Sequence, residues 1–194
     1  MSHRILAISG SPSAKSSGTR LIEHVLTHVP QERFDCDTLR LAELDANALI
    51  RADTAEPSIS AAVRAVAAAE GLIVVTPIYK AAYSGLLKCF LDLLPQFGLA
   101  GKAVMPLATG GSVAHLLSLD YGLRPVLQSM GVRHVVQSVL VTAPQMRVDG
   151  ETLRLDAQGE EMLAAGLEHF LATVEGKGYR SIFGHPMPFS RATG

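Results

Sequence analysis

Residues 5–19, ILAISGSPSAKSSGT, decide the fold of this chain. Residues 5–8 are all apolar and do not alternate with polar residues, which is typical of a strand buried on both faces of a parallel sheet. Ser9-Gly10-Ser11-Pro12 ends this strand, because glycine and proline interrupt regular structure. Apolar residues then return at helical spacing, at Leu21, Ile22, Val25 and Leu26. The stretch therefore predicts a strand, a serine- and glycine-rich loop and a helix in direct succession.

This strand, loop and helix can together hold a phosphate group. The first N–H groups of a helix have no partner inside the helix, and the helix dipole places partial positive charge at that end. Gly10 and Gly18 would let the backbone approach a ligand closely. Further donors are the hydroxyl groups of Ser11, Ser16, Ser17 and Thr19. A serine-rich turn with an ordinary helix N-cap has the same pattern, and the loop alone leaves both interpretations open.

Two common nucleotide-binding motifs are excluded for this loop. A Walker loop requires G-x-x-x-x-G-K-[ST], but the residue before Lys15 is not glycine. A dinucleotide-binding loop requires G-x-G-x-x-G, and position 12 is proline. The remaining pattern is rich in hydroxyl groups and poor in cations. Such a loop suits a terminal phosphate monoester such as that of FMN.

Composition indicates an ordinary single domain with a substantial core, since the chain has 194 residues. Apolar residues make up 48% and charged residues 18%, and the net charge of −1 offers no basic surface for nucleic acid. No apolar run reaches the length of a membrane span, and the first strand begins too early to leave room for a signal peptide. We therefore expect a cytoplasmic protein that binds neither nucleic acid nor membrane.

Neither the cysteines nor two isolated histidines indicate a metal site. Cys36 and Cys89 lack CxxC or metal-ligand spacing, so we expect reduced, structural thiols. His115 and His134 are single histidines, for which packing or surface roles are expected. We predict no metal ligands, and we identify no side chain that would act as a catalytic acid or base.

Further strand signals alternate with helix signals along the chain. Strands are predicted at residues 34–41, where the alternation of apolar and polar residues indicates an edge strand, and at 72–76, 102–108 and 133–141. Helices are predicted at 58–70 with Ser58 as cap, 84–94, 113–130 and 157–174, with an irregular excursion at 42–57 and a hairpin around Asp149-Gly150.

This alternation predicts an α/β fold with a doubly wound sheet of five parallel strands and helices on both faces. The domain is expected over residues 1–175, followed by a loosely held tail over 176–194. In such sheets, ligands bind beyond the carboxyl ends of the strands, where the strand order reverses. Glycine-bearing loops at 9–18, 77–85 and 109–112 fall at that edge, and together they favour a nucleotide or flavin site.

These three loops resemble the NAD(P)H-dependent FMN reductase family, which has a flavodoxin-like fold. The similarity is closest to the FMN reductases that serve alkanesulfonate monooxygenases, the SsuE group. It is carried by residues 76–91 (TPIYKAAYSGLLKCFL), 109–117 (TGGSVAHLL) and 120–127 (DYGLRPVL).

The family's phosphate motif, G-S-x-R-x-x-S-x-[NT], is only partly present. Gly10, Ser11 and Ser16 match it, and Gly18 with Thr19 stands at its end. Ser13 occupies the position of the family's arginine. Lys15 could partly replace that arginine, as a point charge and not as a planar fork.

The resemblance also implies which residues contact FMN. Those around its phosphate would be Ser11, Ser16, Gly18 and Thr19. Those along one side of the isoalloxazine would be Pro77, Ile78, Tyr79 and Lys80, and those along the other Thr109, Gly110, Gly111 and Ser112. One flavin face must stay open, because a hydride passes from nicotinamide C4 to flavin N5 only when the two rings stack.

The helix predicted over residues 113–130 should be distorted near its middle. Pro125 has no N–H for the Tyr121 carbonyl, and Gly122 weakens the same turn. The sequence therefore predicts a kink or π-type bulge centred on Tyr121. In the resembling group, a tyrosine at this place belongs to a π-helix in a tetramer interface near the flavin. We accordingly expect a homo-oligomer, a dimer or a tetramer, in which Tyr121 governs how long FMN is retained.

The resemblance implies an NAD(P)H:FMN oxidoreductase, using NADPH or NADH, that supplies FMNH2 to a separate monooxygenase for alkanesulfonate desulfonation and sulfur acquisition. One alternative is a quinone, azo-compound or chromate reductase with tightly bound FMN. Another is an electron carrier of the flavodoxin type. Such carriers are usually strongly acidic and enclose the flavin between aromatic rings, whereas this chain is nearly neutral and has no tryptophan.

Overall fold

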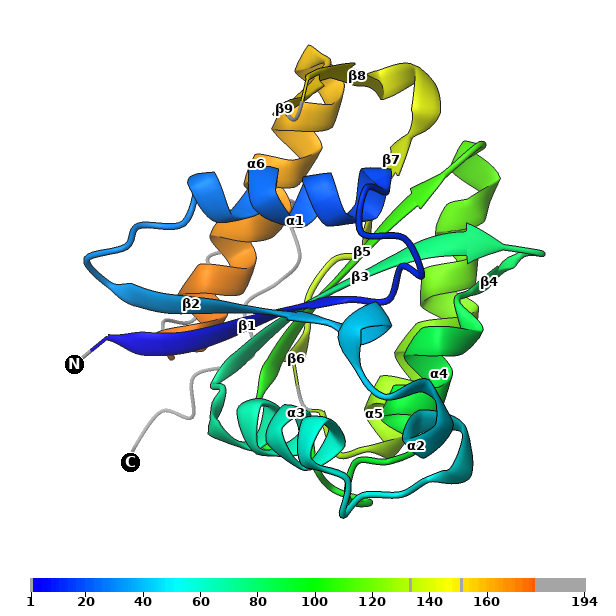
Figure 1. Cartoon of the computed structure of the whole chain (residues 1–194). Helices are drawn as coiled ribbons and strands as arrows, with labels where there is room; N and C mark the ends of the chain where they lie inside the picture. The colour runs from blue at the N-terminus through cyan, green and yellow to red at the C-terminus, as the bar shows by residue number, and fades with distance from the viewer. Residues whose placement is uncertain (1, 133, 151, 177–194) are drawn as a thin grey trace, which may run out of the picture.

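A mostly parallel sheet forms the centre of the computed structural model, which describes residues 2–132, 134–150 and 152–176 (Figure 1). In sheet order the strands are β2 (Phe34–Arg40), β1 (His3–Ser9), β3 (Gly71–Tyr79), β5 (Ala103–Gly110) and a fifth position shared by β6 (His134–Val135) and β7 (Val139–Thr142). This is the flavodoxin-like order. The chain adds β2 on one side of β1 and then crosses over to add β3 and the later strands on the other side. The predicted doubly wound α/β fold and the edge position of β2 are confirmed.

Helices cover both faces of this sheet (Figure 1). One face carries α1 (Ser17–Thr27) and α6 (Ala157–Val174), and the other carries α3 (Pro57–Ala68), α4 (Gly85–Leu91) and α5 (Arg124–Ser129). Alternate residues of β1 enter the two cores. Ile5 and Ala7 belong to the core that contains Phe170, whereas Leu6 and Ile8 belong to the core that contains Phe90. The first strand is thus buried on both faces, as its apolar run predicts.

The excursion over residues 42–57, predicted as irregular, contains regular structure. A short 3-10 helix, η1 (Leu41–Glu43), precedes the helix α2 (Ala46–Arg51). The Asp45 carboxylate accepts the Ala48 N–H at 2.7 Å and caps α2. Only two of its side chains, Ala48 and Leu49, are buried, so apolar spacing gives almost no helical signal here.

Two predicted helix boundaries are wrong. The helix predicted from Ser58 begins at Pro57 and is capped by Glu56, whose carboxylate accepts the Ile59 N–H at 3.0 Å. Proline is favoured at the first helical position because its missing N–H would have no partner there. The helix predicted to reach residue 94 ends at Leu91.

The predicted strand over residues 133–141 is interrupted between β6 and β7. The side chain of Arg124, from α5, contacts the backbone at this break. Its guanidinium donates to the Val135 carbonyl at 2.8 Å, the Val136 carbonyl at 3.0 Å and the Ser138 hydroxyl at 3.2 Å. A cation from α5 thus satisfies backbone oxygens at the break, which a continuous apolar sequence cannot reveal.

The predicted helix over residues 113–130 is divided into three parts. They are a 3-10 helix η2 (Val113–His115), a π-helix η3 (Ser118–Leu123) and α5. The π-type bulge predicted around Tyr121 is therefore confirmed. The hairpin predicted around Asp149-Gly150 is confirmed as β8 (Met146–Asp149) and β9 (Thr152–Leu155), and the last predicted helix coincides with α6.

Other predictions concern the thiols, the membrane and the tail. Burial raises the pKa of the Cys36 thiol, and the neighbouring Asp35 carboxylate adds to this effect, so the thiol stays protonated as a structural cysteine does. No described helix is long and apolar enough to cross a membrane. The predicted tail over 176–194 lies outside the described residues, apart from Gly176.

Replacing Arg124 by Met should lower the free energy of unfolding by about 1–2 kcal/mol, because the carbonyls at the strand break lose a charged donor. The side chain is 25% exposed, so water can replace part of the loss. Urea denaturation would measure the change. Arg147→Met, at an exposed position on β8, is the control and should change the midpoint little. Equal midpoints for wild type and Arg124→Met would contradict this role.

Candidate functional site

The loop between β1 and α1 is braced by its own hydroxyl groups. Ser16 is the N-cap of α1, and its Oγ accepts the Thr19 N–H at 3.1 Å. The Thr19 hydroxyl donates to the Ser13 carbonyl at 3.2 Å, and the Ser11 hydroxyl donates to the same carbonyl at 3.3 Å. The buried Thr19 side chain therefore stabilises the loop through its hydrogen bond to Ser13, and Ser16 lies at the N-terminus of α1.

The charge of this loop suits an anion. Ser17 and Gly18 open α1, so their N–H groups have no partner inside the helix. No aspartate or glutamate occurs between residues 9 and 22, and Lys15 is exposed on the loop. The helix dipole adds partial positive charge at the same place. These features match the donor set that a phosphate monoester requires.

Ser84 joins this loop to the segment that follows β3. Its hydroxyl donates to the Gly10 carbonyl at 2.6 Å and accepts the Leu87 N–H at 3.1 Å, while its own N–H donates to the Thr76 hydroxyl at 2.9 Å. The approach is close: a Cβ on Gly10 would lie 3.0 Å from the Leu87 Cβ and 3.1 Å from the Ser84 Oγ. Ser84 is the N-cap of α4, at the predicted start of that helix, whereas its link to Gly10 has no local sequence signal.

The segment predicted as a loop over residues 77–85 is largely a hairpin. β3 continues to Tyr79 and pairs in antiparallel fashion with β4 (Ala82–Tyr83). The two turn residues, Lys80 and Ala81, have φ values of 50° and 62°. A two-residue turn of this kind normally takes Asn or Gly, because other side chains are strained at positive φ. Strain of this kind is often found at functional sites.

The four residues predicted along this side of the flavin divide into two pairs. Pro77 and Ile78 are buried, so their side chains belong to the sheet and only their backbone borders the edge. Tyr79 and Lys80 are exposed at the tip of the hairpin. The accessible side chains on this side are thus one aromatic ring and one cation.

The third loop lies beside the hairpin. Thr109 is the register partner of Pro77, and β5 continues to Gly110, beyond the predicted strand end. A Cβ on Gly111 would meet no atom within 4 Å, so the backbone there faces open space. Ser112 caps η2 by accepting the Ala114 N–H at 3.3 Å. The predicted convergence of the three loops at one sheet edge is therefore confirmed.

Two buried polar side-chain atoms in the described part of the chain lack a hydrogen-bond partner, and both lie at this edge. They are Ser9 Oγ, at the end of β1, and His115 Nδ1, next to Gly110. Buried polar groups are almost always paired, because an unpaired one costs about 1–3 kcal/mol. Unpaired atoms at the rim of three convergent loops are typical of a site that binds a polar ligand. The residues present therefore fit a phosphorylated flavin.

The π-helix η3 supports the hairpin and presents Tyr121 to solvent. The Ser118 hydroxyl donates to the Ala81 carbonyl at 2.9 Å, so η3 holds the strained turn. A Cβ on Gly122 would lie 3.7 Å from the Tyr83 ring, and partial burial raises the pKa of the Tyr83 phenol. Tyr121 itself is 80% exposed.

Sequence and structure comparisons agree with this geometry. The sequence profile of the family described as NADPH-dependent FMN reductase matches residues 3–146. The chain belongs to this family. It is 38% identical over 168 residues to the FMN reductase (NADPH) of Pseudomonas putida, covering 86% of this chain and 85% of that protein. It is 40% identical over 146 residues to the FMN reductase (NADPH) of Escherichia coli K12, covering 74% and 75%.

A solved structure gives the same result. The apo form of the NADH:FMN oxidoreductase EMOB matches with a TM-score of 0.80 and 48% sequence identity, over 89% of this chain and 90% of that chain. Family membership confirms the predicted resemblance and makes this FMN reductase family member an oxidoreductase that uses FMN with a reduced nicotinamide. Which residues contact the flavin stays a prediction.

Replacing Ser84 by Ala should lower the free energy of unfolding by about 1–3 kcal/mol, because the buried Gly10 carbonyl loses its donor and α4 loses its cap. Chemical denaturation of the purified protein would measure the loss. Ser129→Ala removes an exposed hydroxyl on α5 that donates to the Val126 carbonyl, and it serves as the control. Equal losses of unfolding free energy in the two variants would show that the hydrogen bond from Ser84 to Gly10 stabilises the fold no more than an exposed one does.

Proposed function

We propose that the chain reduces free FMN with NAD(P)H in the cytoplasm and releases the reduced flavin to a separate FMNH2-dependent monooxygenase acting on alkanesulfonates. The observation that supports release is the donor set of the loop over residues 9–18. It offers hydroxyl and backbone N–H groups with one exposed lysine, and Ser13 stands where the family has an arginine. A point charge holds phosphate less firmly than a bidentate guanidinium, so the flavin can leave.

In this proposal the phosphate binds where the loop meets the N-terminus of α1. Ser11 and Ser16 would supply hydroxyl groups, and Ser17 and Gly18 would supply the N–H groups that α1 leaves unpaired. Thr19, the other residue predicted at the phosphate, would border it while its hydroxyl holds Ser13 and Ser16 in position. Each contact would be a single hydrogen bond to the phosphate, without a bidentate guanidinium, which suits a flavin that binds and dissociates during turnover.

Positioning of the two rings is the contribution expected of the other loops. Bound FMN supplies the redox chemistry, since it accepts a hydride from a reduced nicotinamide. The Tyr79–Lys80 hairpin tip and the backbone of Gly110, Gly111 and Ser112 would border the flavin from opposite sides. The open space above Gly111 allows close approach of a flat ring. No acid or base is required, because correct stacking of the rings accounts for the acceleration.

Self-association is the second part of the proposal. Tyr121 (80% exposed), Val113 (73%) and Leu117 (57%) are exposed apolar side chains on η2, η3 and the residues that join them. Large exposed apolar groups that include an aromatic ring are typical of protein interfaces. We propose that this surface mediates a dimer or tetramer. Because η3 also holds the hairpin through Ser118, assembly would influence how long the flavin is retained.

Steady-state kinetics test the flavin proposal. NAD(P)H oxidation by the wild type should saturate with added FMN, and gel filtration should leave little bound flavin. Ser16→Ala should raise the KM for FMN about tenfold, because one hydrogen bond to a charged phosphate is lost. The KM for riboflavin should not change, because riboflavin has no phosphate. Both NADPH and NADH are to be used, since the relatives are named for both.

Ser129→Ala, far from the loop, is the matched serine control for these measurements. Flavin that stays bound through gel filtration, together with efficient quinone reduction, would favour the alternative reductase with tightly held FMN. An equal effect of Ser16→Ala on FMN and on riboflavin would show that the loop does not contact the phosphate.

Replacing Tyr121 by Ala should shift the protein to a smaller assembly in sedimentation velocity and change the rate at which FMN dissociates. The aromatic ring is expected to contribute at the centre of the interface, so its loss should raise the dissociation constant of the assembly at least tenfold. Ile50→Ala is the control, because Ile50 is 73% exposed on α2. Unchanged assembly, flavin retention and oxidase activity in Tyr121→Ala would refute the proposal.

A further inference from the structure

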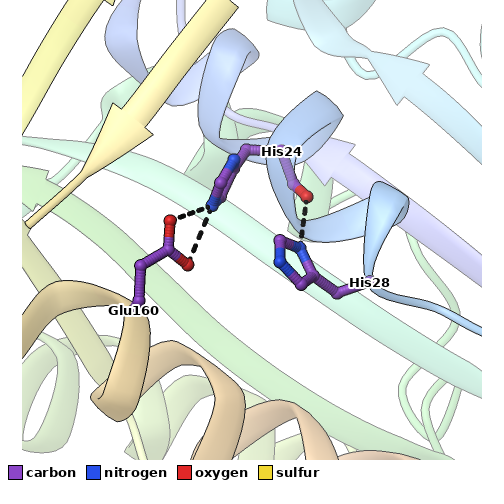
Figure 2. Close-up of side chains that lie close together, drawn as sticks. All are labelled: His24, His28 and Glu160. Atoms are coloured by element: carbon purple, nitrogen blue, oxygen red, sulfur yellow. Dashed lines mark hydrogen bonds and ion pairs between the residues drawn. The ribbon is translucent and has the colours of Figure 1, made fainter. Parts of the chain in front are cut away.

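Two histidines and a glutamate form a cluster between α1 and α6, away from the three loops (Figure 2). His24 belongs to α1 and His28, four residues later, is the C-cap of this helix, so the two side chains lie on the same side about one turn apart. Glu160 belongs to the first turn of α6. Each residue offers one potential ligand atom, and these atoms all lie within 4.8 Å of one another.

His24 and Glu160 already face each other. The Nε2 atom of His24 lies 2.9 Å from Oε1 and 3.1 Å from Oε2 of the Glu160 carboxylate. Figure 2 shows both contacts as dashed lines. In a tetrahedral zinc site, metal–ligand distances of about 2.0–2.2 Å separate neighbouring ligand atoms by about 3.4 Å. The pair therefore needs to open by only about half an ångström to share an ion.

His28 is oriented so that it can supply a second imidazole nitrogen. Its Nδ1 lies 2.9 Å from the His24 carbonyl oxygen, which can only accept, so Nδ1 carries the proton. The Nε2 atom is then left with a free lone pair. Figure 2 shows this second nitrogen on the side of the ring toward His24 and Glu160. Metal-bound histidines typically donate their other N–H to a backbone carbonyl in this way, which fixes the tautomer and the ring orientation.

We propose that His24, His28 and Glu160 bind one divalent transition-metal ion, with Zn²⁺ as its representative. Imidazole with carboxylate suits Zn²⁺ and the neighbouring ions of the first transition row, whereas Mg²⁺ and Ca²⁺ prefer sites built from oxygen ligands alone. Three protein ligands leave one tetrahedral position for water.

The surroundings permit an ion to enter and to have a structural effect. A groove of about 590 Å³, lined by His28, Glu160 and leucines of α6, borders the cluster. His28 is exposed, so an ion can reach the cluster from solvent. The ion would join the end of α1 to the start of α6, two helices that pack on the same face of the sheet. The site does not depend on the proposed flavin chemistry.

This proposal departs from the sequence prediction of no metal ligands, which did not consider His24 and His28. His115 and His134 are isolated in the sequence, whereas the H-x-x-x-H spacing of His24 and His28 on a helix is a recognisable ligand pattern. Glu160, the third ligand, is 136 positions from His24 and becomes a neighbour only in the folded chain.

The test uses untagged, full-length protein treated with a chelator and then dialysed. Calorimetric titration with ZnCl2 should show one ion per chain, and Zn²⁺ should raise the midpoint of thermal unfolding. Co²⁺ should give the visible absorption of a bound, low-symmetry ion. His28→Gln and Glu160→Gln should each weaken Zn²⁺ binding at least about tenfold. FMN reductase activity without added metal should stay at the wild-type level in His28→Gln, which shows that the variant is folded.

His3→Gln is the matched control. His3 Nδ1 lies 2.8 Å from Glu70 Oε2, so it forms a similar histidine–carboxylate pair that lacks a second imidazole. This variant should bind Zn²⁺ as the wild type does. The proposal is overturned if wild-type protein shows no saturable binding, if His28→Gln binds with unchanged affinity, or if His3→Gln is weakened as much as His28→Gln.

Discussion

Parallel pairing of β1, β3 and β5 is the constraint on which the rest of this structure depends. Because parallel strands share one direction, their carboxyl ends and the loops that follow them lie at one edge of the sheet. Ser84 then joins two of these loops by donating to the Gly10 carbonyl at 2.6 Å. The glycine is required because a side chain there would press on Leu87. The sheet thus brings together the three loops at which we propose that the flavin binds.

The π-helix shows how a local distortion is stabilised by distant contacts. Its hydrogen bonds span five residues, as in the bond from the Arg124 N–H to the Leu119 carbonyl, and a network around Asp120 adds further contacts. The Asp120 carboxylate accepts the Arg124 Nε–H at 3.2 Å and the Ser138 hydroxyl at 2.8 Å. The same arginine satisfies the carbonyls at the break between β6 and β7. One set of contacts therefore fixes the fifth strand, the π-helix and, through Ser118, the turn beside the flavin loops.

Much of the fold could be predicted from short stretches of sequence. The two-sided burial of β1 follows from four consecutive apolar residues, and the start of α1 follows from Ser16 as an N-cap. Pro125 cannot supply an N–H to the Tyr121 carbonyl, so the helical distortion was predictable as well. These features depend on backbone sterics and periodicity within a few residues. For the same reason, the serine-rich loop by itself is compatible with a phosphate site or an ordinary N-cap, and the phosphate site stays a prediction.

The sequence by itself determined the alternation of the main strands and helices, and hence the fold class and the three candidate loops, because these signals lie within single segments. Only the tertiary structure decided how segments meet. The strand break depends on Arg124, and the link between loops depends on Ser84. The turn at Lys80 and Ala81, where φ is positive, is held by the hydrogen bond from Ser118 to the Ala81 carbonyl. The partnership of Glu160 with His24 likewise exists only after α6 has folded against α1. Such contacts join residues far apart in the chain, so they cannot be predicted from local spacing or from secondary-structure propensity.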